Sequence, residues 1–541
     1  MSSASHSAEV VIVGLGPVGA VAANLAGAAG FKVLVIDRDQ APFALPRAIV
    51  FDAEIMRIFA SIGLADEISA ITRPLGGSVY LGADHRPIRT FRSPGPAHDL
   101  AWAPSNLFYQ PTLETRIREG LSRFPNVTVR TGCEVMDVAT SDHGAHLKVA
   151  DGQGGSFEID AGFVLACDGA SSTVRKRLGI GLDDIGFEER WLVIDAHLHG
   201  AMQWPDLYEI PPEVRDGRYS LMVCDPRQPA TIIPGVGAHR RWEYMLSPGE
   251  TDAQAVKPAR IAERLSQWAD PAEVEVVRSA VYRFRALVAH RWRAGNVFLL
   301  GDAAHQTPPF FGQGMCHGIR DAAQLIWRLR MVRDGAASPA LFDDYQTERE
   351  PHVREIITAS VTAGAAVCIT DPEKAQERDE EFRALELARA GAPVAMTDVV
   401  PPIRAGLIDP ASGGARLPEF AVAVDGEAER LDPWLVGGFS ILSAAPLDDL
   451  ALSPGDATRW AAISRPPIRL ATLGPAKFHD VDGRFAAWLA KQSALAVIVR
   501  PDRYVYGAAG SMAALRQLVV SLLEQVSGQA DGRSHAESAL S

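Results

Sequence analysis

The chain has 541 residues, too many for one compact core, so two or three domains are expected. Apolar residues make up 47% of it and charged residues 22%, which is ordinary for a globular enzyme. The formal net charge of −13 argues against binding to nucleic acid or to an anionic membrane surface.

Targeting and cysteine patterns point to a reducing compartment. No run of about 18 apolar residues predicts a membrane span, and the first ten residues lack the pattern of a secretion signal. The five cysteines are scattered without a close pair, which argues against a disulfide framework, a zinc or other metal site, or a redox dithiol. A cytoplasmic location is expected.

Residues 10–39 read as a buried strand, an alanine-rich helix and a second buried strand. Gly14 permits a tight turn, Gly16 lets backbone approach a pyrophosphate, and Gly19 lets the helix pack close to the strand. Asp37 ends the second strand, where an acid binds ribose hydroxyls. The unit predicts a dinucleotide site, open at this point between NAD and FAD. The next residue, Arg38, either pairs with a phosphate or is solvated.

A second strand–loop–helix unit lies at residues 294–329. An apolar strand ends at Gly301 and Asp302, a loop rich in proline and glycine follows, and residues 315–329 form an amphipathic helix. Such a unit builds another pocket for sugar hydroxyls and ring edges.

These motifs resemble those of the FAD-dependent aromatic hydroxylases, the single-component flavoprotein monooxygenases. The family's GD motif matches Gly301–Asp302, and its DG motif matches Asp168–Gly169 followed by Arg175. The family's Pro-x-x-Gly-x-Gly loop matches 309–314, and Arg47 stands where the family has an arginine near the FAD phosphates. The candidate cofactor-binding residues are Gly14, Gly16, Pro17, Gly19, Asp37, Arg38, Arg47, Gln110, Arg116, Asp168, Gly169, Arg175, Gly301, Asp302, Pro309, Gly312, Gly314 and Met315.

The resemblance implies a chemistry. NADH or NADPH reduces FAD, O2 adds to the flavin, and the C4a-hydroperoxide delivers one oxygen atom to an electron-rich ring. Pro309 and Gly312 are catalytic candidates because they lie beside the flavin ring in the family. Only one full glycine fingerprint is visible in the sequence, so the nicotinamide cofactor is expected to visit and leave.

Residues 181–284 alternate between apolar and polar, as antiparallel strands do. In the family such a sheet supplies the substrate pocket. Residues 224–250 look like the same segment in the 3-(3-hydroxyphenyl)propionate hydroxylases, which implies a phenolic acid hydroxylated ortho to its hydroxyl. Residues 204–220 depart from that subgroup. The alternatives are a tailoring hydroxylase of larger polycyclic aromatics and a flavin reductase that inserts no oxygen.

One strand of this region, 240–246, has two distinct faces. Trp242 and Tyr244 share one face, and Arg241 and Glu243 share the other. The aromatic pair either walls the pocket or packs inside the sheet. A base that removes the phenolic proton would assist the reaction, and the candidates are His199, Tyr208, Tyr219 and Tyr244.

The last third alternates short strands and helices, which suggests a small α/β domain. It resembles the thioredoxin-like domain of phenol-type hydroxylases, but no cysteine lies beyond Cys368 to carry dithiol chemistry. Its expected role is structural, with subunit contact in a homodimer as one option. The polar tail 528–541 is expected to be disordered.

The predicted architecture is therefore α/β with four segments. Residues 1–180 form the first part of a Rossmann-like FAD-binding domain, with some substrate-domain strands near 76–100. Residues 181–284 form the inserted antiparallel-sheet substrate domain. Residues 285–395 complete the FAD-binding domain, and 396–541 form the thioredoxin-like domain.

Overall fold

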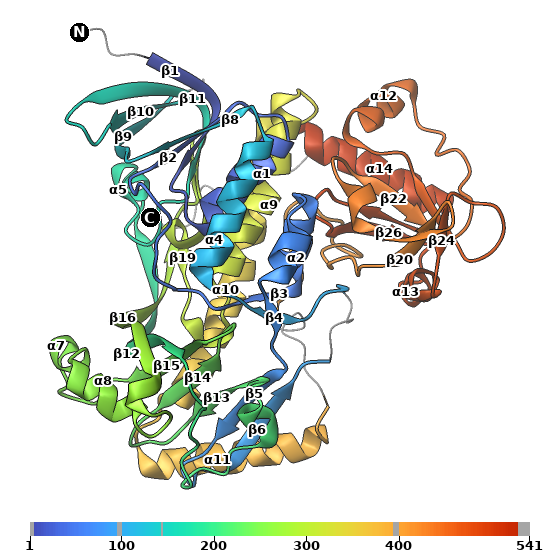
Figure 1. Cartoon of the computed structure of the whole chain (residues 1–541). Helices are drawn as coiled ribbons and strands as arrows, with labels where there is room; N and C mark the ends of the chain where they lie inside the picture. The colour runs from blue at the N-terminus through green and yellow to red at the C-terminus, as the bar shows by residue number, and fades with distance from the viewer. Residues whose placement is uncertain (1–4, 95–99, 142–143, 393–399, 529–541) are drawn as a thin grey trace, which may run out of the picture. The chain divides into compact units, whose positions relative to one another are not determined.

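The structure is a computed structural model that describes residues 5–94, 100–141, 144–392 and 400–528 (Figure 1). The chain divides into two compact units, Met1–Ala322 with Val353–Pro401, and Ala323–His352 with Pro402–Ser541. Two long helices, α9 (Gly314–Arg333) and α10 (Asp343–Val367), contribute residues to both units. The predicted disordered tail 528–541 lies outside the described residues except for Gly528.

The first unit contains a mainly parallel sheet built on the predicted strand–helix–strand segment. Its strand order is β17-β18-β11-β1-β2-β8, and β9 and β10 extend it from β11. The strands are β1 (Ser5–Val13), β2 (Val33–Asp37), β8 (Val127–Thr131), β9 (Glu134–Ser141), β10 (Gly144–Ala150), β11 (Ser156–Ala166), β17 (Arg293–Ala294) and β18 (Val297–Leu299). β1, β2, β8, β11 and β18 run parallel, so their carboxyl ends meet at one edge of the sheet.

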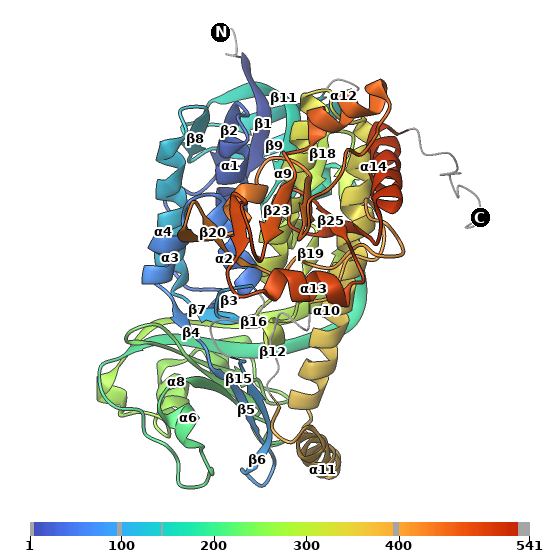
Figure 2. The same ribbon diagram turned by 90° about the vertical axis from the view of Figure 1, so that its right-hand side faces the viewer.

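The same unit contains short helices and a three-stranded sheet, and Figure 2 shows α1 to α4 and β3, β4 and β7 next to the parallel sheet. The helices are α1 (Pro17–Ala28), α2 (Ala53–Ser61), α3 (Ala65–Ala70), α4 (Gln110–Glu119) and α5 (Thr173–Arg177). The small sheet pairs β3 (Val50–Asp52) and β4 (Arg73–Pro74) with β7 (Ser105–Leu107).

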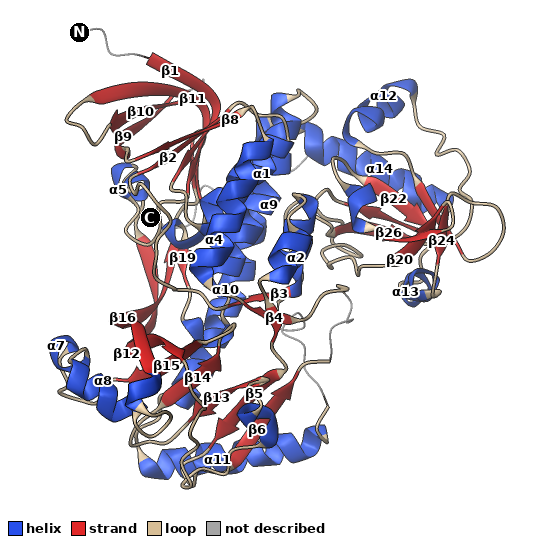
Figure 3. Cartoon of the chain, in the orientation of Figure 1, coloured by secondary structure: helices blue, strands red, loops and turns tan. Residues whose placement is uncertain are grey.

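A second eight-stranded sheet of the first unit has the order β19-β16-β12-β15-β14-β13-β5-β6 (Figure 3). Its strands are β5 (Gly77–Leu81), β6 (Pro87–Arg92), β12 (Leu182–Leu198), β13 (Tyr219–Val223), β14 (Ala230–Pro234), β15 (His239–Met245), β16 (Val274–Ala289) and β19 (His305–Gln306). Neighbouring strands are antiparallel except β5 and β13, which are parallel. The helix α11 (Pro372–Arg389) runs along the edge strand β6 (Figure 1).

One face of this second sheet buries an apolar core. Trp242, Tyr244 and Trp268 are each at most 1% exposed within it. Two residues of the divergent segment 204–220 pack into the same core. Val214 belongs to the short helix α6 (Pro212–Arg215), and Ile210 lies just before that helix.

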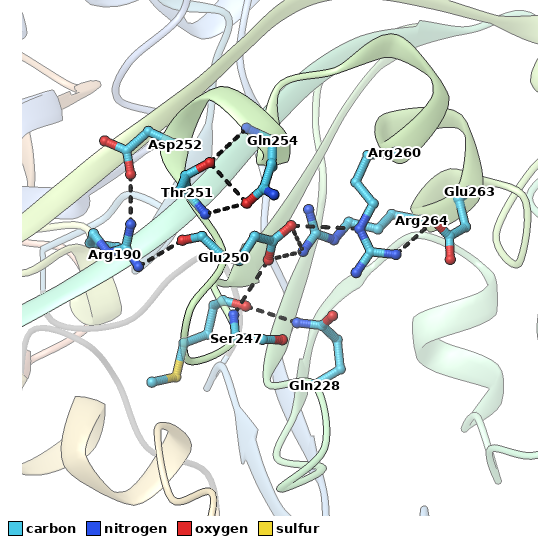
Figure 4. A network of polar contacts seen from close by, with 11 residues as sticks. Arg190, Gln228, Ser247, Glu250, Thr251, Asp252, Gln254, Arg260, Glu263 and Arg264 are labelled. Carbon is cyan, nitrogen blue, oxygen red and sulfur yellow. Dashed lines mark hydrogen bonds and ion pairs between the residues drawn. The ribbon is translucent and has the colours of Figure 1, made fainter.

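The segment after β15 folds into α7 (Asp252–Ala255) and α8 (Pro258–Leu265) and is held by polar contacts (Figure 4). Glu250 accepts two hydrogen bonds from the buried Arg264 guanidinium, at 2.8 and 3.0 Å. Arg190 on β12 donates to the Glu250 carbonyl and pairs with Asp252. A capping box between Thr251 and Gln254 closes the start of α7.

The second unit contains a seven-stranded sheet of order β21-β20-β24-β23-β22-β25-β26. Its strands are β20 (Ala421–Val424), β21 (Glu427–Arg430), β22 (Ser440–Ser443), β23 (Ile468–Ala471), β24 (Phe478–Asp480), β25 (Ala496–Val499) and β26 (Val505–Ala509). Its helices include α12 (Pro454–Ile463), α13 (Arg484–Lys491) and α14 (Met512–Ser527). Beside this sheet, Glu348 is buried against Arg328 and Arg500 at 2.6 and 2.7 Å.

No single helix among the described residues has both the length and the apolarity of a membrane span. Only α10 and α11 taken together, extended back to Pro339 and bent by 119°, pass that test of length and composition.

Candidate active site

The glycine turn between β1 and α1 has two glycines that the fold requires and one that it does not. Gly14 has a φ of +97°, and a Cβ added to it would lie 2.5 Å from the Cys167 carbonyl oxygen. A Cβ on Gly19 would lie 1.9 Å from the Gly14 carbonyl oxygen. A Cβ on Gly16 would meet no atom within 4 Å. Gly16 therefore borders open space at the start of α1, where Pro17 follows and the helix N–H groups are free to bind an anion.

Asp37 lies at the end of β2 beside this turn. Its carboxylate accepts hydrogen bonds from the backbone N–H groups of Leu15 and Asp39, which fix its orientation. Arg38 is exposed.

Gln110, the first residue of α4, holds the loop that carries Arg47. The Gln110 Oε1 accepts the backbone N–H groups of Arg47 and Ala48 at 2.9 and 2.7 Å. Both Gln110 and Arg47 line the large cavity described below. Arg116, by contrast, does not line that cavity; it is exposed on the far part of α4 and pairs with Glu119 at 2.8 Å.

The turn after β11 is braced from within. Asp168 accepts the Ser172 hydroxyl at 2.6 Å and the Val174 N–H at 3.1 Å, which stabilises the start of α5. Arg175 is 4% exposed and donates to the carbonyls of Ala303 and Ala170. Asp168 and Arg175 therefore hold the turn after β11 against the turn after β18. Of the three predicted residues Asp168, Gly169 and Arg175, Gly169 lines the cavity.

The turn after β18 presents Asp302 to the cavity. Asp321 on α9 accepts the Gly301 N–H at 3.0 Å and the His305 Nε2 at 2.8 Å, so the helix holds both ends of the turn. The Asp302 side chain is open to the cavity but lies deep within the protein, so desolvation raises its pKa, while His305 and Arg47 oppose the rise.

The loop 309–315 closes this end of the cavity, and Pro309, Gly312, Gly314 and Met315 all line it. Gly312 has a φ of +63° and lies close against Val50. A Cβ on Gly314 would meet nothing within 4 Å, so α9 begins at open space. The buried Arg320 donates a hydrogen bond to the Gln313 Oε1 at 3.0 Å, which fixes the Gln313 side chain.

The cavity has a volume of about 1190 Å³, and one face of the second sheet forms its opposite wall. Paired residues on neighbouring strands point to the same side, so the register aligns lining residues in rows. The first row is Glu243, Thr231, Met222, Tyr80 and Arg89, on β15, β14, β13, β5 and β6. The second, two residues along each strand, is Arg241, Ile233, Ser220, Ser78 and Phe91.

This register decides which face of strand 240–246 meets the cavity. Arg241 and Glu243 line it, whereas Trp242 and Tyr244 pack in the core on the other side. The aromatic wall is therefore the wrong interpretation of this strand, and sheet packing is the right one. The Tyr244 hydroxyl donates to the Arg264 carbonyl at 3.0 Å within that core.

His199 does not reach the cavity either. Its side chain is 61% exposed and lies 3.4 Å from Glu275 at the edge of the sheet. Tyr208 and Tyr219 also lie outside the lining and pack against the apolar core.

Two arginines of the wall differ in their partners. Arg241 forms a two-point ion pair with Asp195 and donates to the Arg47 carbonyl at 2.6 Å. The Arg89 guanidinium lies 4.5 Å from the Phe91 ring centroid and 5.0 Å from that of Phe382 on α11. Within the described ranges its side chain makes no hydrogen bond or salt bridge, and its Nε is buried without a partner. No local pattern in the sequence marks Arg89, because only the pairing of β5 with β6 brings it to the cavity.

The residues present fit FAD. The free helix start at Gly16, the fixed carboxylate of Asp37, and the backbone of Gly169 and Asp302 lie along one edge of a parallel sheet, as a dinucleotide requires. The open space at Gly314, facing the sheet wall, is the room that a flat ring would need.

Known families and proteins match this arrangement. Residues 7–360 match the FAD binding domain family, and residues 414–525 match the HcaD C-terminal domain. A probable NADH-specific resorcinol 4-hydroxylase of Rhodococcus jostii (strain RHA1) is 33% identical over 522 residues, covering 96% of this chain and 95% of its own. A 3-(3-hydroxy-phenyl)propionate/3-hydroxycinnamic acid hydroxylase of Burkholderia cenocepacia (strain HI2424) is 32% identical, covering 92% of this chain and 93% of its own.

Solved structures agree in fold. The flavin-dependent monooxygenase PieE, in complex with FAD and substrate, is 22% identical with a TM-score of 0.79, covering 97% of this chain and 99% of its own. Aklavinone-11 hydroxylase, in a ternary complex with FAD and aklavinone, is 22% identical with a TM-score of 0.75, covering 96% of this chain and 99% of its own. From its glycine turn, its braced cofactor edge and these matches, the chain belongs to the FAD-dependent aromatic hydroxylases, the flavoprotein monooxygenases.

Proposed function

We propose that this enzyme hydroxylates a phenolic ring that carries an acidic side chain, ortho to the hydroxyl, with 3-(3-hydroxyphenyl)propionate or a related phenolic acid as substrate. The single observation that carries the proposal is the Arg89 guanidinium in the cavity wall, which forms no hydrogen bond or salt bridge among the described residues, although the carboxylates of Glu381 and Glu386 act on its charge from α11. An arginine in a protein cavity is stabilised by a carboxylate ligand, with which it forms charge-assisted hydrogen bonds.

The length of the wall supports an extended substrate. Arg89 and Glu243 stand on strands four places apart, and strands lie about 4.8 Å apart, so their backbones are separated by about 19 Å. The Glu243 end lies beside the loops of Arg47 and Phe310, which border the flavin site. A ring at that end brings its carboxylate within reach of Arg89 only if the substrate is extended and the long Arg89 side chain leans along the wall toward the ring.

The residues bind, orient and exclude water. When bound, FAD would supply the redox chemistry, which is the transfer of electrons from NADH or NADPH to O2 and of one oxygen atom to the ring. Arg47, Gln110 and Asp302 would hold the cofactor, and Pro309 and Gly312 would shape the space beside its ring. The apolar Met222, Ile233 and Phe91 would cover the substrate and keep water from the reacting carbon.

A tailoring hydroxylase of larger polycyclic aromatics is the second candidate. A cavity of about 1190 Å³ is larger than most single-ligand pockets, although it must also hold the flavin ring. A flavin reductase that inserts no oxygen is disfavoured by the family assignment.

We further propose that the second unit has a thioredoxin-like fold without redox function, and its order of strands and helices supports this. The segment β22-α12-β23 is a parallel β-α-β unit, and β25 and β26 with α14 form an antiparallel β-β-α unit beside it. We propose the division into 1–180, 181–284, 285–395 and 396–541, a cytoplasmic location, and a homodimer as the assembly.

The test is a substrate panel with purified enzyme. Phenolic acids of increasing side-chain length, neutral phenols including resorcinol, and a polycyclic phenol are scored for stimulated NADH and NADPH oxidation. Product is then analysed for one atom of label from ¹⁸O2. We expect the phenylpropanoate length to give the strongest stimulation with an ortho-diol as product. Stimulation by neutral or polycyclic phenols alone would refute the phenolic acid, and unlabelled product would refute the oxygenation.

A further inference from the structure

Glu243 occupies a defined position between the two loops that border the flavin site. Arg241, two residues before it on β15, donates to the Arg47 carbonyl of one loop. Met245, two residues after it, pairs with Trp191, whose ring lies 6.0 Å from that of Phe310 in the other loop. Because alternate residues of a strand face the same side, the Glu243 side chain faces the space between these loops.

The carboxylate of Glu243 has one ion-pair partner at long range and no hydrogen bond among the described residues. The residue is 7% exposed and lines the cavity, yet over the described ranges its carboxylate accepts no hydrogen bond. Its nearest cation is Arg241, with Nη1 3.9 Å away. That guanidinium is already engaged by Asp195, which also binds His239 at 2.8 Å.

Buried carboxylates that accept no hydrogen bond are costly, so one that persists in a cavity is a functional candidate. Burial raises the pKa of Glu243 to about 7, with Arg241 opposing the rise and Asp195 adding to it. A group that titrates near the working pH is suited to accept and release a proton.

We propose that Glu243 is the catalytic residue that accepts the proton of the substrate's phenolic hydroxyl. The inference rests on the proposed function, since it requires a phenol in the cavity. The phenolic O–H bond breaks, its electron pair stays on the phenol oxygen, and the proton joins a Glu243 carboxylate oxygen. Arg241 then lies close to the new phenolate and stabilises its charge.

The overall reaction balances as phenol, O2, NAD(P)H and H⁺ giving diol, water and NAD(P)⁺. Glu243 is unchanged at the end, because the proton returns to the product or to water when the ring becomes aromatic again. Its contribution is to raise electron density at the ortho carbon when that carbon is attacked, an effect typically worth about 10²- to 10⁴-fold in rate.

The test compares wild type with Glu243→Gln, which keeps the shape but cannot take the proton. In wild type, kcat at saturating substrate is expected to fall as the pH drops below about 7, because Glu243 becomes protonated. In Glu243→Gln we expect kcat to be at least 100-fold lower and this decline to vanish, with KM changed less than kcat. Glu243→Asp should restore part of the rate, and Glu275→Gln, an exposed carboxylate on β16, should behave as wild type.

A second measurement reads the acceptor directly. A hydroxyphenyl acid whose phenol ionises in water only well above the working pH, and whose phenolate absorbs at a longer wavelength than the phenol, is bound in weak buffer with a pH indicator. In wild type above pH 7, phenolate should form without release of a proton to solvent, because Glu243 keeps it. In Glu243→Gln we expect one of two results. Either each phenolate that forms releases one proton to solvent, or no phenolate forms. If Glu243→Gln fails to bind FAD, the proton release measured in wild type alone decides whether Glu243 is the proton acceptor.

The two proposals fail differently. If wild type converts phenols but releases one proton for each phenolate bound, or if Glu243→Gln keeps kcat within threefold of wild type, Glu243 is not the acceptor and the proposed function stands. If no phenol stimulates wild type, the proposed function is refuted, and the role of Glu243 with it.

Discussion

Arg241 and Asp195 form a two-point ion pair across β15 and β12, with Nε–Oδ1 at 2.8 Å and Nη2–Oδ2 at 3.0 Å. Both residues are buried, and the third guanidinium nitrogen donates to the Arg47 carbonyl. The pair therefore connects the sheet wall to the cofactor edge. Although burial acts to raise it, His239 and Arg241 hold the pKa of Asp195 below its usual value.

Removing the anion of this pair should be strongly destabilising. In Asp195→Asn the Arg241 cation stays buried without a counter-charge, so we expect the free energy of unfolding to fall by about 3–5 kcal/mol. Urea denaturation followed by tryptophan fluorescence measures it. Glu188→Gln, which breaks the exposed pairs with Arg283 and Arg285, should cost no more than about 1 kcal/mol. Equal losses in the two variants would contradict the assignment.

The glycine turn allows the cofactor requirement to be separated from the folding requirement. Gly16→Val places its side chain in open space, so the apoprotein should melt within a few degrees of wild type and yet bind FAD at least 100-fold more weakly. Gly19→Ala places a Cβ against the Gly14 carbonyl and should lower the melting temperature of the apoprotein itself. Flavin fluorescence titration and calorimetry check both. A Gly16→Val protein that retains full FAD affinity would show that the phosphate lies elsewhere.

Arg89 should determine the preference for acidic substrates. Replacing it with Gln removes a charge-assisted interaction worth roughly 2–3 kcal/mol, so KM for a phenolic acid should rise about 30- to 150-fold. Stimulation of NADH oxidation by a neutral phenol should stay within twofold of wild type. Arg92→Gln serves as control, because Arg92 pairs with Glu386 and is absent from the cavity lining. An unchanged KM for the acid would place its carboxylate away from β6.

Glu348 should make the stability of the second unit depend on pH. Burial acts to raise its pKa, but Arg328 and Arg500 outweigh burial and lower it to about 2. A depressed carboxyl pKa stabilises the folded state above the unfolded value of 4.5, by roughly 3 kcal/mol, and this is lost as the pH falls from 4.5 towards 2. Glu348→Gln should therefore melt well below wild type at pH 7, and the gap should narrow below pH 4.5.

Differential scanning calorimetry from pH 7 to pH 3 measures that gap. The control is Glu427→Gln, an exposed position on β21, which should follow wild type at every pH. A gap that is constant with pH would mean that the loss in Glu348→Gln comes from packing and not from charge.

Much of the cofactor edge could be predicted from sequence because its signals are local. Gly14, Gly16 and Asp37 lie within one short strand–helix–strand unit, and the structure has β1, α1 and β2 where the pattern predicts them. The roles of Gln110 and Arg175 were harder to assign. Gln110 lines the cavity and also accepts a hydrogen bond from the Arg47 backbone, whereas Arg175 donates to the carbonyl of Ala303 in another turn. Both contacts join segments that are far apart in sequence.

The substrate wall was not predictable in the same way. The alternation along residues 240–246 correctly gave two faces, but not which of them turns to the cavity. His199 and Tyr244 have suitable chemistry for a base, yet one is exposed at the edge and the other is buried in the core. The type of a side chain does not show whether it lies in the cavity, in the core or in solvent. Here that depends on how the strands of residues 77–92 and 219–245 pair in the sheet.

By itself the sequence determined the parallel cofactor edge, because a glycine turn and a strand-terminal acid act within a few residues of backbone. Only the tertiary structure decided that Glu243 and Arg89 share one wall, since that follows from the order and register of five strands. A one-residue shift in the pairing of β15 would have turned Trp242 and Tyr244 to the cavity instead, with the same sequence.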